Sequence, residues 1–290
     1  MKIDWRKVLC VITAMATAVT FAGAYAAEKS TEAAALLPAT IKEAGALRIA
    51  VPDIGKPLAY KAGTTLKGMD VDLAEALSSV LGLKAEISLV PFAAALTGLQ
   101  ANKYDISFGE FYVTAERLKV ADFVTNWQDY SSFLVAKATG YKPTKLADIC
   151  GRKIGAMAGS AELETLNKAA GACTGVKPEV SAFQSVSNAI LALNSNRVDG
   201  VLINRGGAQE SIRLDPGLDA SGEVGGGPTA TAVARNENSE ALLAAIKAGY
   251  DVLIKNGEYA KILEKNDTAY GAVKEAVIFK QDSTPPKYGF

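Results

Sequence analysis

Apolar positions in the first part of the chain recur with two periods in turn. Residues 47–52 (LRIAVP) form a short apolar run typical of a strand, whereas residues 68–83 place apolar side chains at helical spacing. A second strand (84–92), a helix (92–103) and a third strand (104–111) follow. This βαβαβ order predicts an α/β fold with parallel strands and right-handed crossovers, and such sheets bind ligands beyond the carboxyl ends of their strands.

A second unit repeats the pattern further along the chain. Its alternating strands and helices are predicted at 152–160, 161–171, 176–183, 185–197 and 198–204. Gly159, Ser160 and Asn204 fall on the carboxyl edge of this unit. A chain of 290 residues suits two lobes better than one core.

The first 26 residues have the pattern of a secretory signal peptide. Lys2, Arg6 and Lys7 precede an apolar run at 8–21, and small residues then lead to a cleavage site after Ala26. A membrane anchor is the alternative, but this run is shorter than the ~20 residues that span a bilayer. We therefore expect a soluble mature protein that is exported to the periplasm.

Composition excludes several kinds of chemistry. The chain has no histidine, which excludes Ser-His-Asp triads, Cys-His dyads and most zinc sites, so we expect no metal, no cofactor and a binding role. Lysines and arginines do not exceed the acids, so no basic surface for nucleic acid or membrane is predicted. Cys150 and Cys173 form an even pair after export, which favours a disulfide over a buried reduced pair.

Arg117 stands at an unusual place. It comes three residues after Thr114, a candidate N-cap, where a strand changes into a helix. First helical turns favour acidic side chains because of the helix dipole, so an arginine here suggests a site for an anion. The alternative is an ordinary salt bridge to Glu116 or Asp122.

Five motifs in order resemble the extracellular solute-binding proteins of the polar amino acid and opine class, the periplasmic receptors of ABC importers. They are LRIAVPDIGKPLAY, LKGMDVDLAEALSSVLGL, LQANKYDISFGEFYVTAERLKVADF, ICGRKIGAMAGSAE and ALNSNRVDGVLIN. The resemblance covers almost the whole mature chain. It implies a two-lobed periplasmic binding protein fold (type II) that closes on a small ligand, acts as a monomer and delivers the ligand to an inner-membrane ABC permease.

The resemblance also implies domain boundaries. The first lobe would comprise residues 27–130 and the returning segment 232–290, and the second lobe residues 131–231. The two crossover strands would lie near 129–132 and 230–232.

In this family, the arginine that matches Arg117 binds the carboxylate of the ligand through a bidentate ion pair. The turn before the second lobe's first helix, with Ser160 and Ala161, would offer backbone N–H groups to the same anion. Phe92 matches an aromatic that lies against the ligand in relatives, with plain core packing as the alternative.

The chain departs from the family at the amine end of the expected site. Asn204 stands where relatives that bind ordinary amino acids have an Asp, and Gly109, Glu110 and Tyr112 stand where they tend to have Ser or Thr. Glu110 could replace the missing partner of an ammonium group, or point to solvent. Alternatively, the nitrogen of the ligand is substituted, as in opines.

Two other functions stay open from the sequence. Cyclohexadienyl dehydratases share this fold and use a cleft carboxylate as a general acid, a role that Glu110, Glu162 or Glu164 could take here. A module that signals occupancy to a partner receptor is the second.

Overall fold

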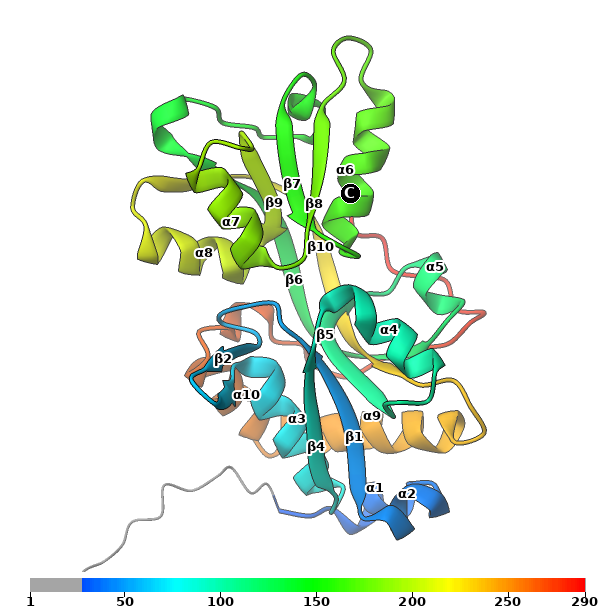
Figure 1. The fold of residues 1–290 in the computed structure, drawn as a ribbon. Coiled ribbons are helices and arrows are strands. Elements are labelled where there is room, and N and C mark those ends of the chain that lie inside the picture. The colour runs from blue at the N-terminus through cyan, green and yellow to red at the C-terminus, as the bar shows by residue number, and fades with distance from the viewer. Residues whose placement is uncertain (1–27, 290) are drawn as a thin grey trace, which may run out of the picture.

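Two long antiparallel strands, β6 (Asp122–Ala136) and β10 (Leu218–Val233), run through both halves of the molecule and join two α/β lobes (Figure 1). The computed structural model describes residues 28–289, so the predicted signal peptide lies outside the described residues. Both expected crossover segments lie in these two strands. Within residues 28–289, none of the helices has the length and apolar character needed to cross a bilayer.

The first lobe is built on β1 (Ala46–Pro52), which pairs in parallel with β4 (Lys84–Val90) and β5 (Ile106–Tyr112). Helices α3 (Met69–Val80) and α4 (Phe92–Gln100) connect these strands, as the alternating pattern predicted. Further elements of this lobe are α1 (Thr31–Ala35), α2 (Ala39–Ala44), β2 (Tyr60–Ala62), β3 (Thr65–Lys67), α5 (Ala115–Leu118), α9 (Ser239–Lys255), α10 (Glu258–Lys265), η3 (Ala269–Gly271) and β11 (Ile278–Phe279).

The second lobe repeats the design. Strand β7 (Lys153–Met157) pairs in parallel with β8 (Glu179–Phe183) and β9 (Gly200–Asn204). Its helices are α6 (Ala161–Ala172), α7 (Val186–Asn194) and α8 (Arg205–Leu214), with the short 3₁₀ helices η1 (Lys137–Thr139) and η2 (Leu146–Ile149). The strand order β4-β1-β5-β10-β6-β9-β7-β8 makes one continuous sheet through both lobes, and β11 adds to β6.

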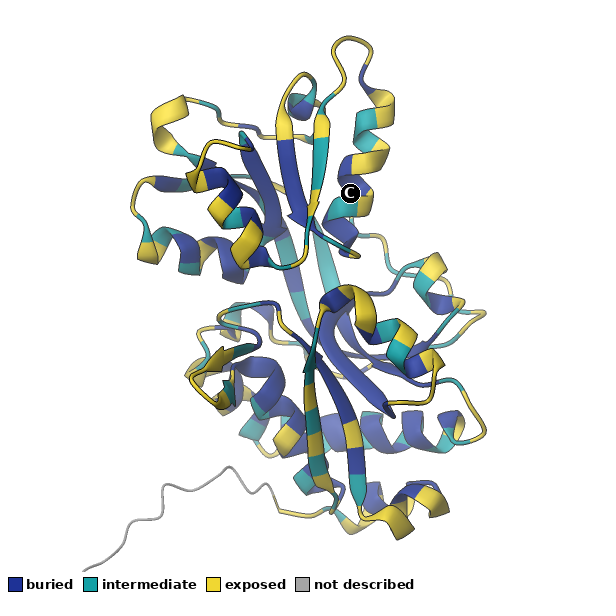
Figure 2. Ribbon diagram, viewed as in Figure 1, coloured by how far each residue is buried: buried dark blue, intermediate teal, exposed yellow. Residues whose placement is uncertain are grey.

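The inner strands of the first lobe are buried, whereas the edge strands β4 and β8 are partly exposed (Figure 2). Every residue of β5 is buried, and Trp127 and Phe123 on β6 have no exposed surface. The second lobe has a smaller cluster that includes Phe133, Leu202 and Cys173. The predicted disulfide is confirmed, since Cys150 and Cys173 are bonded across a sequence separation of 23 residues.

Glycines allow β6 and β10 to cross closely between the lobes. Gly226 pairs with Tyr130, and a Cβ at this glycine would lie 2.7 Å from the Asp129 carbonyl oxygen. Its φ of 152° is also rare for other residues. The strand pairing is irregular here, with register shifts between Ser221 and Gly226.

The C-terminal segment takes a path that the sequence did not indicate. Helices α9 and α10 pack on α3 in the first lobe, as expected. Beyond β11, however, the chain leaves that lobe, and residues 285–289 line a groove with α6 and η2 of the second lobe (Figure 1). The Tyr288 carbonyl accepts a hydrogen bond from Gly226 N–H at 2.7 Å, which ties the segment to β10.

Candidate functional site

A narrow cavity of about 40 Å³ lies between the lobes, at the carboxyl ends of their strands. The structure brings all eight residues proposed from the sequence to this cavity: Phe92, Gly109, Glu110, Tyr112, Arg117, Ser160, Ala161 and Asn204. The other lining residues were not predicted from the sequence as ligand-binding residues: Ile54, Leu58, Asp129, Met157, Glu162 (named only for the enzyme alternative), Val186, Ala189, Val201, Leu202, Ile203 and Thr229.

Arg117 spans the gap between the lobes. Its Nη1 donates to the Tyr112 carbonyl at 2.9 Å, and its Nη2 donates to the Gly159 carbonyl of the other lobe at 3.1 Å. The guanidinium lies over the rings of Phe92 and Phe111, 5.7 and 5.4 Å from their centroids. Burial lowers the pKa of Arg117, but an arginine stays charged at neutral pH.

The salt-bridge alternative for Arg117 is wrong. Glu116 pairs with Lys119 at 2.7 Å, and Asp122 pairs with Arg235. Within residues 28–289, no carboxylate lies within ion-pair distance of the Arg117 guanidinium. A half-buried cation without an ion-pair partner among these residues is suited to an anionic ligand group.

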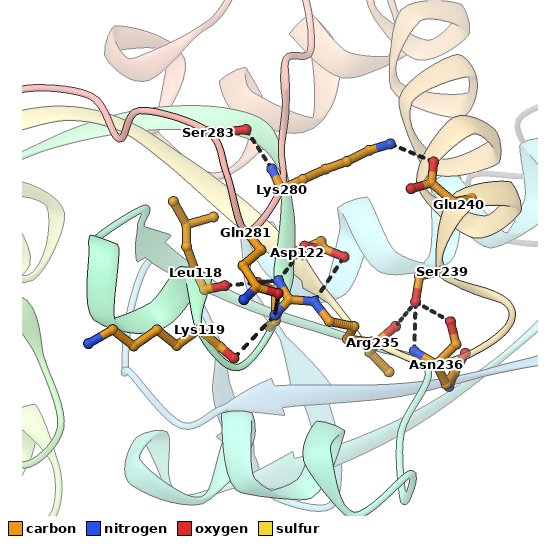
Figure 3. A network of polar contacts seen from close by, with 12 residues as sticks. Leu118, Lys119, Asp122, Arg235, Asn236, Ser239, Glu240, Lys280, Gln281 and Ser283 are labelled. Atoms are coloured by element: carbon orange, nitrogen blue, oxygen red, sulfur yellow. Dashed lines mark hydrogen bonds and ion pairs between the residues drawn. The ribbon is translucent and has the colours of Figure 1, made fainter.

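A second arginine holds the helix that carries Arg117. Arg235, at the end of β10, donates to the carbonyls of Leu118, Lys119 and Ala121, at 2.9 to 3.1 Å, and pairs with Asp122 (Figure 3). At the other end of α5, the Thr114 hydroxyl accepts a hydrogen bond from Arg117 N–H. Both ends of this one-turn helix are therefore fixed.

The second lobe presents the start of α6 to the cavity. Ser160 is the N-cap and accepts a hydrogen bond from Leu163 N–H at 3.1 Å. Glu162, in the first turn, accepts a hydrogen bond from the Ser131 hydroxyl at 2.8 Å. The partial positive charge of the helix N-terminus favours an anion at this side of the cavity.

Gly109 and Glu110 shape the floor of the cavity. A Cβ at Gly109 would lie 2.7 Å from Pro52 Cγ, so only glycine fits there without movement. Glu110 has a φ of 52°, which is uncommon for a residue other than glycine and is typical of functional sites. Its side chain is buried, so the solvent-facing alternative is wrong.

Glu110 forms a cluster with a second buried acid. Its carboxylate accepts hydrogen bonds from the Thr229 hydroxyl and from Asn126 Nδ2, the latter at 3.4 Å. Burial raises the pKa of Glu110, and burial together with the nearby Glu110 charge raises the pKa of Asp70 well above its usual range. Because the two buried carboxyl groups are neighbours, a negative charge on Glu110 opposes the ionisation of Asp70.

Asp129 is the acid that the sequence analysis missed as a site residue. It lies on β6 and is only 2% exposed. Its Oδ1 accepts hydrogen bonds from Tyr130 N–H at 2.8 Å and from the Tyr270 hydroxyl at 3.2 Å, while Oδ2 accepts none within the described residues. Burial raises the pKa of Asp129 to about 8, and the nearby Asn204 amide opposes this shift. Its position in a predicted crossover strand was the only sequence signal for it.

The two aromatic residues have mixed roles. Phe92 lines the cavity and also packs on Phe111, with ring centroids 5.1 Å apart, so its position fits both a ligand contact and core packing. Tyr112 is buried, and its ring contacts that of Tyr288 in the C-terminal segment, with centroids 4.8 Å apart. Burial and the charges of Glu162 and Asp129 raise the pKa of Tyr112 well above its usual range.

Two α/β lobes, joined by two strands and enclosing a cavity that both lobes line, define a two-lobed solute-binding protein. The family of bacterial extracellular solute-binding proteins, family 3, matches residues 47–266, and the chain belongs to this family. The family resemblance that the five sequence motifs indicated is thereby confirmed.

Relatives of known name agree with this assignment. ABC transporter arginine-binding protein 1 of Escherichia coli (strain K12) is 26% identical over 210 residues, covering 70% of this chain and 83% of that protein. The structure of an ancestral arginine-binding protein bound to arginine has a TM-score of 0.71 at 32% identity, covering 77% of this chain and 98% of the other.

The ancestral amino acid-binding protein AncCDT-1, a precursor of cyclohexadienyl dehydratase, has the same fold. Its TM-score is 0.70 at 23% identity, covering 78% of this chain and 97% of the other. The two nearer relatives are named for binding, which supports a binding role over the dehydratase alternative. Of the three acids considered for that alternative, Glu164 does not line the cavity and pairs with Lys168 at 2.6 Å.

Proposed function

We propose that this protein binds a small carboxylated nitrogen compound between its lobes and delivers it to an inner-membrane ABC permease. The ligand carboxylate forms an ion pair with Arg117 and accepts hydrogen bonds from backbone N–H groups at the start of α6. The named relatives, which include an arginine-binding protein of an ABC transporter, support this assignment. The signal-like N-terminus supports export to the periplasm, and we propose that the protein acts there as a monomer.

The observation that supports the proposal best is the position of the Arg117 guanidinium and its hydrogen bonds. Its charge faces the cavity, it bonds only to carbonyl oxygens among the described residues, and it bridges the two lobes. A ligand carboxylate would replace the contact to the Gly159 carbonyl with a charge-assisted pair. The same carboxylate would contact both lobes, so its binding would stabilise the closed arrangement.

The test is the Arg117→Ala variant, with calorimetry against the compound that co-purifies with the protein or emerges from a thermal-shift screen of amino acids and opines. Loss of one partner of a buried charge pair costs ~2 to 5 kcal/mol, which weakens binding roughly 30-fold to several thousand-fold. Arg197→Ala is the matched control, because Arg197 is exposed and lies outside the cavity. An unchanged dissociation constant in Arg117→Ala would refute the proposal.

A further inference from the structure

We infer that Asp129 binds the free ammonium group of the ligand, and that the ligand is an amino acid with an apolar side chain. This inference rests on the proposed carboxylate site at Arg117 and adds the identity of the other two ends of the ligand. The sequence left open whether the nitrogen of the ligand is a free ammonium group or is substituted, as in opines. The inference favours the free ammonium group.

The first step is to account for the acids around the cavity. Among the described residues, the charged side chains that line it are Arg117, Glu110, Asp129 and Glu162. Both carboxylate oxygens of Glu110 already accept a hydrogen bond, Oε2 from the Thr229 hydroxyl and Oε1 from Asn126 Nδ2. Glu162 is held by the Ser131 hydroxyl in the first turn of α6.

Asp129 differs from both. Tyr130 N–H and the Tyr270 hydroxyl fix its Oδ1, which orients the carboxyl group, while its buried Oδ2 has no hydrogen-bond partner of normal geometry within residues 28–289. The Asn204 amide, which also lines the cavity, lies beside this carboxyl group and lowers its pKa, but its buried Nδ2 forms no hydrogen bond of normal geometry within these residues. Buried polar atoms normally have partners, so unsatisfied ones that face a cavity point to a ligand.

The environment of Asp129 favours a cation. Glu110 on β5 and Glu162 on α6 add negative potential at its carboxyl group, and the neutral side chains of Asn204 and Tyr270 contact it from β9 and η3. Arg205 lies over the ring of Tyr270, 4.6 Å from its centroid, and no ion pair to Asp129 is formed within residues 28–289. An ammonium group would supply the missing counter-charge.

The remainder of the cavity is apolar. Its walls include Ile54 and Leu58 of the first lobe and Met157, Val186, Ala189 and Ile203 of the second. Once Arg117 and Asp129 bind the two ends of a zwitterion, the other acids that line the cavity among the described residues are Glu110 and Glu162, which accept hydrogen bonds from Thr229, Asn126 and Ser131. No lining cation within residues 28–289 is left for a second carboxylate. A charged ligand side chain would lose its hydration against the apolar walls. The ligand class therefore differs from the arginine named for the relatives.

Asp129 also links binding to a proton. With a pKa of about 8, its carboxyl group is mostly protonated at pH 7, and pairing with an ammonium requires the charged form. Binding at pH 7 should therefore release close to one proton. The affinity should fall about tenfold for each pH unit below 7.

The experiment uses the mature protein, freed of co-purified ligand by partial unfolding and refolding. Calorimetry measures binding of L-leucine, L-valine, L-methionine, L-phenylalanine, L-arginine, L-glutamate and N-acetyl-L-leucine, in buffers with different heats of ionisation. We expect at least one apolar amino acid to bind ten times more tightly than arginine, glutamate and the acetylated compound, with proton release. Asp129→Asn should weaken this binding tenfold or more and abolish the release, whereas the exposed Asp282→Asn should change neither.

The outcomes separate the inference from the proposed function. The inference is wrong if N-acetyl-L-leucine or L-arginine binds more tightly than every apolar amino acid tested, or if no apolar amino acid binds. These outcomes are measured on the wild-type protein and need no variant. An unchanged affinity in a folded Asp129→Asn protein also overturns the inference. If these results come with a loss of binding in Arg117→Ala, the carboxylate site stands. If Arg117→Ala leaves binding unchanged, the proposed function itself fails.

Discussion

At the scale of single residues, the paired acids Asp70 and Glu110 couple the fold to pH. Both carboxyl groups are buried, and burial raises the pKa of each. A carboxyl group whose pKa is higher in the folded than in the unfolded protein stabilises the fold fully below its unfolded pKa. That stability is lost as pH rises toward the folded pKa.

The Asp70→Asn variant tests this coupling. We expect the wild-type protein to lose stability as pH rises above the ordinary carboxyl pKa of about 4, and the variant to lose less, by up to about 1.4 kcal/mol per pH unit. Urea unfolding of the ligand-free protein at several pH values measures the difference, with Asp282→Asn as an exposed control. Parallel curves for the wild type and Asp70→Asn would show that Asp70 does not couple the fold to pH.

At the scale of elements, α5 is too short to be stable alone and depends on its neighbours. It has four residues, and its only acidic first-turn residue, Glu116, is exposed. Arg235 provides the anchor, because it binds three carbonyls at the end of α5 and pairs with the buried Asp122 (Figure 3). We interpret Arg235 as a positioning residue for Arg117.

Replacement of Arg235 by Met should lower the free energy of unfolding by roughly 2 to 4 kcal/mol, because it leaves Asp122 and the carbonyls without their partner. It should also weaken ligand binding, through the misplaced Arg117. The control is Lys280→Ala in the same region, since Lys280 pairs with Glu240, whose side chain is 77% exposed. Solvent screens this exposed pair, so its loss should change stability little. Urea unfolding and calorimetry measure both effects, and a stable Arg235→Met protein with normal affinity would contradict the positioning role.

At the scale of the whole molecule, the lobes are in contact across the cavity. Lys56 of the first lobe lies 3.7 Å from Glu210 of the second, and Arg117 bonds to the Gly159 carbonyl. The C-terminal segment adds a further link, because the Tyr288 hydroxyl accepts from Val113 N–H at 2.6 Å and donates to the Pro228 carbonyl at 3.0 Å. This segment therefore connects the strand β10 to the chain that leads into α5.

Removal of residues 282–290 should favour the open arrangement. We expect a larger radius of gyration by X-ray scattering without ligand, and ligand dissociation faster by a factor of about 10 or more, since the three hydrogen bonds of Tyr288, at ~1 kcal/mol each, are lost. Tyr288→Phe removes only the hydroxyl and should give a smaller change in the same direction. Unchanged scattering and dissociation in the truncated protein would assign the segment no role in closure.

Much of this protein follows from local sequence patterns. Helical and strand periods are local properties, so the order of elements in both lobes could be predicted, and parallel strands bring their carboxyl ends to one edge wherever they pack. That rule and the family motifs together predict from the sequence that Arg117, Ser160 and Asn204 line one binding site. The disulfide was predictable because the two cysteines are an even pair in an exported chain.

Only the tertiary structure decided the electrostatics of the site. Asp129 depends on Tyr270, which is 141 residues away, and Glu110 depends on Asp70 and on Thr229, 119 residues further along. The pKa of a carboxyl group is set by burial and by its neighbours in space, which no local pattern encodes. The sequence could therefore identify the acids near the cavity, while the packing of both lobes, the two crossing strands and the C-terminal segment determined which of them is free to meet a cation.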